Sequence, residues 1–167
     1  MIRWLLRRKI AAFERAWNYD STYMREVLDA DPRALMVFAK VMGLTQYHKD
    51  VPLGAYYAVK IVGTMAEDCG PCTQLAIDMA ERAGVDAAAL RALVGRDRST
   101  LPEDMGLAAG FAEANLRHAP EADALRGFAL TAARIFPTLK YALGHGRACQ
   151  RVTVGGESKP VPVSHAA

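Results

Sequence analysis

Two cysteines spaced three residues apart are the residues of this chain that are most suited to chemistry. Cys69, Gly70, Pro71 and Cys72 form a C-x-x-C motif, and an apolar segment with helical periodicity, 73–83, follows directly. Two thiols at the start of a helix can close a small disulfide, and the helix N-terminus favours the thiolate of a sulfur that faces its free N–H groups. The motif predicts dithiol–disulfide exchange, with Cys69 as the exposed attacking sulfur and Cys72 as the more buried resolving partner.

Two other groups could move protons for this cysteine pair. Glu67 stands two residues before Cys69, where a carboxylate could accept a proton from a thiol, although its negative charge would also raise the thiol pKa. His145 stands in a Gly-His-Gly sequence at the end of the last predicted helix, where it could act as an acid or base or could satisfy free helix carbonyls. The sequence thus predicts a catalytic set without a cofactor or a bound metal, composed of Cys69, Cys72, Glu67 and His145.

Two non-catalytic interpretations of the cysteines remain open. Both sulfurs could be small buried apolar groups, in which case the protein would be a helical scaffold or interaction protein. Alternatively, zinc could be held by Cys69, Cys72, His145 and Cys149, because thiolates and an imidazole are suitable ligands. A second C-x-x-C motif, which many zinc sites have, is absent from the sequence. Metal content and thiol reactivity would separate the three interpretations.

The composition indicates one globular domain of ordinary size. The chain has 167 residues, of which 51% are hydrophobic and 23% charged, and its net charge of +3 is too small to argue for nucleic-acid binding. The odd number of cysteines, 3, suits a reducing compartment rather than a disulfide framework. No secretory signal pattern is visible, and the longest apolar run, 51–66, contains Lys60 and is shorter than a bilayer span. We therefore expect a cytoplasmic protein without a membrane span.

Helix signals recur along the chain, whereas strand signals are scarce. Asp31 and Asp86 are predicted N-caps and Gly84 is a predicted helix stop. Only segment 151–154 alternates as a strand does. We predict a single all-α domain over 1–154 and a loosely ordered tail over 155–167. The predicted helices cover 4–17, 24–28, 32–47, a segment from 52, 73–83, 87–94, a segment from 102, and 120–141 with a kink or break at Pro137.

The helical pattern argues against a thioredoxin fold. Cys-Gly-Pro-Cys is the tetrapeptide of thioredoxins, and segment 59–62 before it could form a short strand. A thioredoxin fold, however, needs several strands around the motif and a proline-bearing strand that faces the disulfide. None of the candidate prolines, Pro52, Pro102 and Pro137, stands in a strand pattern, and Asp68 replaces the Trp expected before the first cysteine.

Two blocks of the sequence resemble the AhpD-like, carboxymuconolactone-decarboxylase-like superfamily. The first block, 55–84, carries Glu-Asp-Cys-Gly-Pro-Cys, and the second comprises 101–104, 111–118 and 136–146 and is similar to an uncharacterised branch of that superfamily. The resemblance covers about half of the chain. It implies an AhpD-like all-α fold in which the C-x-x-C opens a buried helix, and assembly into a homo-oligomer. It further implies a thiol–disulfide oxidoreductase or alkylhydroperoxidase-related activity with a dithiol or redox-protein electron donor.

The resemblance does not extend to the proton relay of the superfamily's redox members. Tyr57 stands where a Glu is expected one helix upstream, Pro71 replaces the inner His, and Ala76 replaces the outer His. The region around Gly127 is also short for such a protein. Neither this relay nor the decarboxylase chemistry, whose catalytic residues find no match, can be carried over to this chain.

Overall fold

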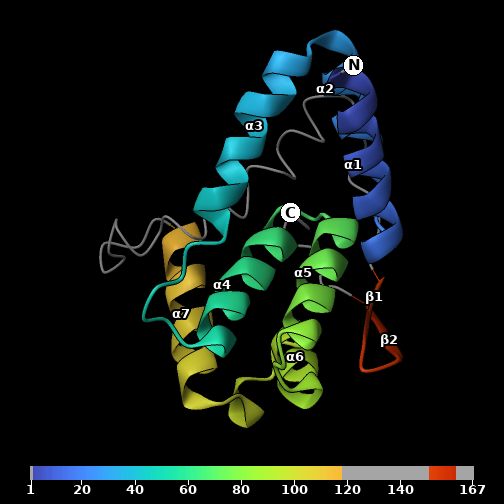
Figure 1. Ribbon diagram of the computed structural model, residues 1–167. Helices are drawn as coiled ribbons and strands as arrows, with labels where there is room; N and C mark the ends of the chain where they lie inside the picture. The colour runs from blue at the N-terminus through green and yellow to red at the C-terminus, as the bar shows by residue number, and fades with distance from the viewer. Residues whose placement is uncertain (1, 118–150, 161–167) are drawn as a thin grey trace.

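Helices dominate the part of the chain that the computed structural model describes, residues 2–117 and 151–160. These ranges contain seven α-helices, a single 3-10 turn and one β-hairpin (Figure 1). A mostly helical architecture, consistent with the predicted all-α class, is therefore confirmed for these residues, and segment 59–62, which could have been a thioredoxin strand, lies within a helix. The elements are α1 (Ile2–Trp17), α2 (Thr22–Ala30), α3 (Pro32–Thr45), α4 (Leu53–Ala66), α5 (Gly70–Arg82), α6 (Ala87–Val94), η1 (Arg98–Thr100), α7 (Glu103–Leu116), β1 (Arg151–Val154) and β2 (Glu157–Pro160).

The first three helices form one group, which we call the N-terminal layer. Their shared core is small, with Ile10, Leu28 and Leu35 as its buried members. Salt bridges join Arg7 of α1 to Asp29 of α2, and Arg25 of α2 to Glu14 of α1, at the surface. Exposed pairs of this kind contribute little to stability, so the layer is held together mainly by its few apolar contacts.

Helices α4 to α7 form a second group, the helical bundle. Its core is much larger and includes the fully buried residues Ile61 of α4, Ile77 of α5, Leu90 of α6 and Ala112 of α7. Apolar residues on α4 are buried around most of the helix, because α5, α6 and α7 all pack against it. Figure 1 shows α4 and α5 side by side in the bundle, below the N-terminal layer in this view.

Local signals in the sequence fix several helix ends as predicted. The Asp86 carboxylate accepts the N–H of Ala89 (2.9 Å) and caps α6. At the C-terminal end of α5, Gly84 has a φ of 92° and its N–H donates to the Glu81 carbonyl (3.0 Å). These features confirm Gly84 as the residue that stops α5. Asp31 accepts the N–H of Arg33 (2.8 Å) at the start of α3.

The tail requires a correction, because residues that we expected to be loosely ordered form strand β2. Strand β1 pairs with β2 in an antiparallel hairpin, and Gly155 and Gly156 adopt positive φ in the turn between them. Val152 and Val154 are buried in the bundle core. Gln74 of α5 exchanges two hydrogen bonds with the Thr153 backbone, donating to its carbonyl (2.8 Å) and accepting its N–H. The hairpin is thus anchored to α5, and only 161–167 of the tail lies outside the described residues.

Within residues 2–117 and 151–160, no helix has both the length and the apolar character that crossing a membrane requires. The helix predicted over 120–141, with its break at Pro137 and the short region around Gly127, lies outside the described residues.

Candidate functional site

The C-x-x-C motif lies in the tight corner between α4 and α5. Asp68 ends α4 with a φ of 50°, its N–H donates to the Met65 carbonyl (3.0 Å), and the Cys69 N–H donates to the Thr64 carbonyl (3.3 Å). This pair of bonds is the Schellman arrangement, which closes a helix through a residue in the left-handed region. Since Cys69 is also the N-cap residue of α5, the motif begins its helix with no intervening loop.

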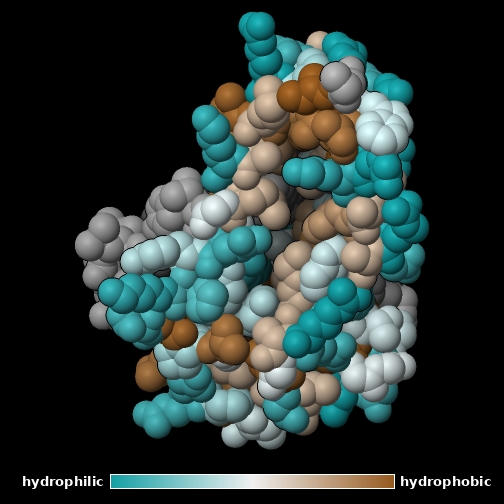
Figure 2. Space-filling model, in the orientation of Figure 1, coloured by the Kyte–Doolittle hydropathy of each residue, from teal (hydrophilic) through white to brown (hydrophobic). Residues whose placement is uncertain are grey.

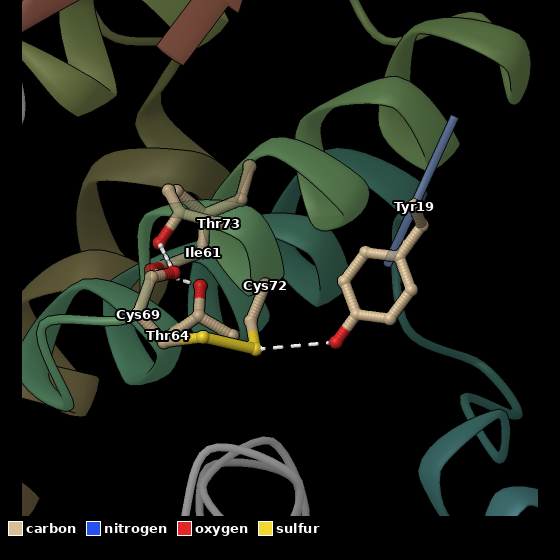
Figure 3. Close-up of a disulfide and its surroundings, with 6 residues drawn as sticks. All are labelled: Tyr19, Ile61, Thr64, Cys69, Cys72 and Thr73. Carbon is tan, nitrogen blue, oxygen red and sulfur yellow. Dashed lines mark hydrogen bonds between the residues drawn. A yellow bond between two sulfur atoms is a disulfide. The ribbon is translucent and has the colours of Figure 1, made fainter. Parts of the chain in front are cut away.

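Cys69 and Cys72 are joined by a disulfide across the first turn of α5, with their Cα atoms 5.3 Å apart (Figure 3). The N–H and the hydroxyl of Thr73 both donate to the Cys69 carbonyl, at 2.9 and 3.0 Å. On the α4 side, the Thr64 hydroxyl donates to the Ile61 carbonyl (3.0 Å). The polar groups beside the sulfurs are therefore satisfied inside the protein, and the disulfide is held on a fixed backbone.

A tyrosine from the N-terminal layer faces this disulfide. The Tyr19 hydroxyl lies 3.6 Å from the Cys72 sulfur, and Figure 3 shows the ring pointing its oxygen at that atom. Because a disulfide sulfur carries no hydrogen, the hydroxyl is the donor. Asn18, with a φ of 46°, ends α1 so that the Tyr19 N–H donates to the Glu14 carbonyl (3.2 Å). This turn, which resembles the turn at Asp68, directs Tyr19 toward the bundle.

Burial keeps the Tyr19 hydroxyl protonated. The pKa of Tyr19 is raised to about 12, mainly by loss of solvent; a hydrogen bond from Tyr23 partly opposes this effect, and the charge of Asp20 adds to it. The Phe13 and Tyr23 rings pack edge-to-face against the Tyr19 ring, with centroids 5.8 and 6.5 Å away. Tyr19 is thus a fixed, neutral hydrogen-bond donor aimed at Cys72.

A cavity of about 80 Å³ separates the N-terminal layer from the bundle at this point. Figure 2 shows the molecule hollowed between the two groups of helices. The walls are mostly apolar, with a few polar side chains among them. The lining residues are Phe13, Tyr19, Tyr23, Met24, Met42, Thr45, Lys60, Thr64, Cys72, Leu75, Ala76 and Met79.

Lys60 supplies the charged group of this cavity. Its ammonium donates to the Tyr56 hydroxyl (3.0 Å) and lies 4.8 Å from the centre of the Tyr56 ring. Tyr56 in turn donates to the Thr45 carbonyl (2.5 Å). Desolvation lowers the pKa of Lys60 to about 8. Among the described residues, no carboxylate lies within ion-pair distance of it, so this cation is stabilised only by neutral groups.

The structure corrects the predicted accessibility of the two cysteines. Cys69 was expected to be exposed, yet it is 3% exposed, and Cys72 is 6% exposed. The corner between α4 and α5 encloses Cys69, whereas Cys72, one turn into the helix, lines the cavity. Both cysteines are therefore buried, and of the two it is Cys72, rather than the expected Cys69, that lines the cavity.

The other predicted site residues are only partly placed. Glu67 and Asp68 are both buried beside the motif, at 8% exposure each. His145 and Cys149 lie outside the described residues, so neither the proposed acid–base role of His145 nor the zinc interpretation is tested. Within residues 2–117 and 151–160, no group of three or more His, Cys, Asp or Glu side chains is arranged to hold a metal.

Sequence reasoning missed Tyr19 and Lys60. Tyr19 is 53 residues away from Cys72 in the chain, and only the folding of the N-terminal layer onto the bundle brings the two together. Asn18 was the available signal, because Asn tolerates the left-handed conformation that ends a helix. Lys60 had a clearer signal, since it is a lone charge in the apolar run 51–66. Such a charge is either exposed or placed at a polar site.

Comparisons with protein-family models, with curated proteins and with solved structures found no match to this chain.

Proposed function

We propose that this protein is a thiol–disulfide oxidoreductase that cycles between the Cys69–Cys72 disulfide and the dithiol, with Cys72 as the sulfur that exchanges with the substrate. The observation that carries the proposal is the position of Cys72. Its sulfur lines a cavity and faces the Tyr19 hydroxyl at 3.6 Å, whereas Cys69 is enclosed by the corner between α4 and α5. An incoming reactant in the cavity meets Cys72 before Cys69.

Reduction then proceeds by two exchanges. A thiolate of a dithiol donor attacks the Cys72 sulfur, the S–S bond breaks, and Cys69 leaves as a thiolate. The second thiol of the donor loses its proton and attacks the donor sulfur of the mixed disulfide, which releases Cys72 as a thiolate and the donor as a disulfide. Two electrons pass from the donor to the protein, and the two cysteine thiolates take up the protons that the donor thiols have lost.

Oxidation by a hydroperoxide returns the pair to the disulfide. The Cys72 thiolate attacks the terminal peroxide oxygen, the O–O bond breaks, and the leaving alkoxide takes up a proton to become an alcohol. The resulting sulfenic acid is attacked by Cys69, which loses its thiol proton as water departs. The N-terminus of α5 stabilises the thiolate of Cys69, its N-cap residue, during this exchange.

Tyr19 takes over one task of the missing proton relay. Its hydroxyl remains protonated at neutral pH, because burial holds its pKa at about 12. A hydrogen bond from a neutral donor to a thiolate stabilises the charged form, which lowers the pKa of the thiol. Tyr19 is therefore proposed to stabilise the Cys72 thiolate, and Glu67 and His145 remain the proposed proton acceptors.

Membership of the AhpD-like superfamily is part of this proposal. It is supported by the all-helical architecture and by a C-x-x-C that opens a helix buried among others, as α5 is. The same resemblance supports a cytoplasmic protein that assembles into a homo-oligomer and takes electrons from a dithiol or a redox protein. Sedimentation of the purified chain tests the assembly, and a sedimenting monomer would remove that part of the proposal.

A second candidate, a non-catalytic helical scaffold, is favoured by one observation. Both cysteines are almost fully buried, as structural cysteines commonly are. In that case the pair would be inert toward disulfides and peroxides even after reduction.

A trapped mixed disulfide tests the proposal against this alternative. In a Cys149→Ser background, which removes the third thiol, Cys69→Ser leaves Cys72 alone, and Cys72→Ser leaves Cys69 alone. On treatment with oxidised glutathione at neutral pH, we expect the chain with Cys72 to gain one glutathione by intact mass and the chain with Cys69 to gain little. Equal labelling would contradict the role of Cys72, and no labelling of either chain would favour the scaffold.

A further inference from the structure

The cavity between the N-terminal layer and the bundle holds a partly buried cation that the proposed thiol chemistry does not use. Lys60 projects into this space from α4, and its contacts within residues 2–117 and 151–160 are the Tyr56 hydroxyl and the faces of the Tyr56 and Tyr57 rings. A lysine in such a place costs free energy, because desolvation of the ammonium is not offset by a negative charge among the described residues. An anion that entered the cavity would offset that cost.

The remaining walls define what such an anion must carry. Phe13, Met24, Met42, Leu75 and Met79 give the cavity a largely apolar surface. Three of these five side chains are methionines, which are flexible and adapt to irregular apolar shapes. A fully hydrated inorganic ion would make no apolar contacts with these side chains, whereas a short hydrocarbon chain would bury its apolar surface against them.

The size of the cavity limits the length of that chain. Its volume of about 80 Å³ is smaller than the roughly 150 Å³ of an apolar cavity that accommodates benzene. A ligand with a carboxylate and a tail of a few carbons is therefore the largest kind that fits without a rearrangement of the two helical groups. Tyr19 and Thr64 are also lining residues and carry hydroxyl groups.

We propose that this cavity binds a short-chain monocarboxylate, with its carboxylate on the Lys60 ammonium and its alkyl tail among Met24, Met42 and Met79. The site is separate from the thiol chemistry, since a saturated carboxylate neither gains nor loses electrons there and binds with the disulfide closed. A bound molecule also lies against Cys72, which lines the same space, so it competes with reactants that approach this sulfur.

Propanoate, which is smaller than benzene, is the probe for this proposal, and propan-1-ol is its uncharged counterpart of equal length. The experiment uses the full oxidised chain labelled with ¹³C at the methionine methyl groups. On titration with propanoate, we expect NMR signals of Met24, Met42 and Met79 to shift, while Met36, which is exposed on α3, and Met105, which is buried in the bundle, stay in place. Signals that do not move, or a shift confined to Met36, would overturn the site.

The charge requirement is tested by calorimetry on two lysine variants. Lys60→Met keeps the length of the side chain and removes the charge, and we expect it to weaken propanoate binding by about tenfold or more while leaving propan-1-ol binding unchanged. Lys40→Met removes an exposed lysine of α3 and should change neither. Equal propanoate affinity in wild type and Lys60→Met would contradict the proposal. If Lys60→Met fails to fold, the wild-type preference for propanoate over propan-1-ol decides the question, and equal affinities would overturn the proposal.

These measurements are independent of the redox proposal. A chain whose thiols prove inert can still bind propanoate, and a chain that forms the Cys72 mixed disulfide can still fail to bind it.

Discussion

The N-terminal layer and the helical bundle contribute to the same site but are held together very differently. The bundle has a continuous core that extends from α4 to α7 and includes the valines of β1. The layer has three buried apolar core residues and leaves large apolar side chains exposed, such as Trp4, Leu5 and Val37. The cysteines belong to the well-packed part, whereas Tyr19 belongs to the sparsely packed part.

This difference suggests how the site works. The layer touches the bundle through a few specific contacts near the cavity. Tyr19 meets Cys72, and Arg82 of α5 donates to the Ala16 carbonyl (2.5 Å) and stacks on the Trp17 ring at 3.9 Å. Regions with few buried contacts open at low free-energy cost. We therefore expect the cysteines to keep their geometry while the layer opens and closes the cavity above them.

The largest expected effect is a difference in the free energy of unfolding that is lost when a core residue of the bundle, or one of the N-terminal layer, is replaced by alanine. Ile77→Ala removes a fully buried side chain from the bundle and should destabilise the protein by about 4 kcal/mol, near the upper end for such changes. Leu35→Ala in the layer should cost about 2 kcal/mol, because its small core can collapse around the change. Urea unfolding measures both costs. An equal cost at the two sites would contradict the difference in packing.

A second prediction concerns Lys60, which lies at the boundary of the two regions. Because burial lowers its pKa from 10.5 to about 8, the charged lysine should cost about 3 kcal/mol below pH 8. Between pH 8 and pH 10.5, Lys60 is protonated in the unfolded chain but largely neutral in the folded protein. The cost of the buried charge therefore declines as pH rises through this range and vanishes above pH 10.5. Lys60→Met should therefore be more stable than wild type at pH 7, and the advantage should disappear by about pH 10.5.

The control for this prediction is Lys40→Met, which should track wild type at every pH. An advantage of Lys60→Met that stayed constant from pH 7 to pH 10.5 in urea titrations would mean that packing, rather than desolvation of the charge, is responsible.

A smaller effect is expected where the hairpin joins the bundle. Gln74→Ala removes both side-chain bonds to the Thr153 backbone and should cost about 1 kcal/mol. Amides of 151–154 should then exchange with solvent faster, while those of α1 to α3 remain unchanged. Faster exchange in the N-terminal layer would show that the hairpin and the layer are coupled, contrary to the arrangement described here.

Local signals made the helices predictable, whereas the site depends on contacts that local signals do not specify. Asp86 and Gly84 mark helix ends through bonds to residues three positions away, so the sequence contains the whole interaction. Strand β2 was missed because its partner, the edge of β1, is stabilised by Gln74, 79 residues away from Thr153. The accessibility of Cys69 was wrong for the same reason, since the corner that encloses it is formed by the end of α4 as well as by α5.

The most direct test of the account is the rate of alkylation of Cys72 against pH in reduced Cys149→Ser protein, with and without Tyr19→Phe. Mass spectrometry locates the label, and Tyr47→Phe, which changes an exposed tyrosine, is the control. We predict that Cys72 reacts before Cys69 with an apparent pKa below the usual thiol value of about 8.5. Tyr19→Phe should raise that pKa by about one unit, and Tyr47→Phe should leave it unchanged. Preferential labelling of Cys69, or a Cys72 pKa that Tyr19→Phe does not move, would contradict the central claim.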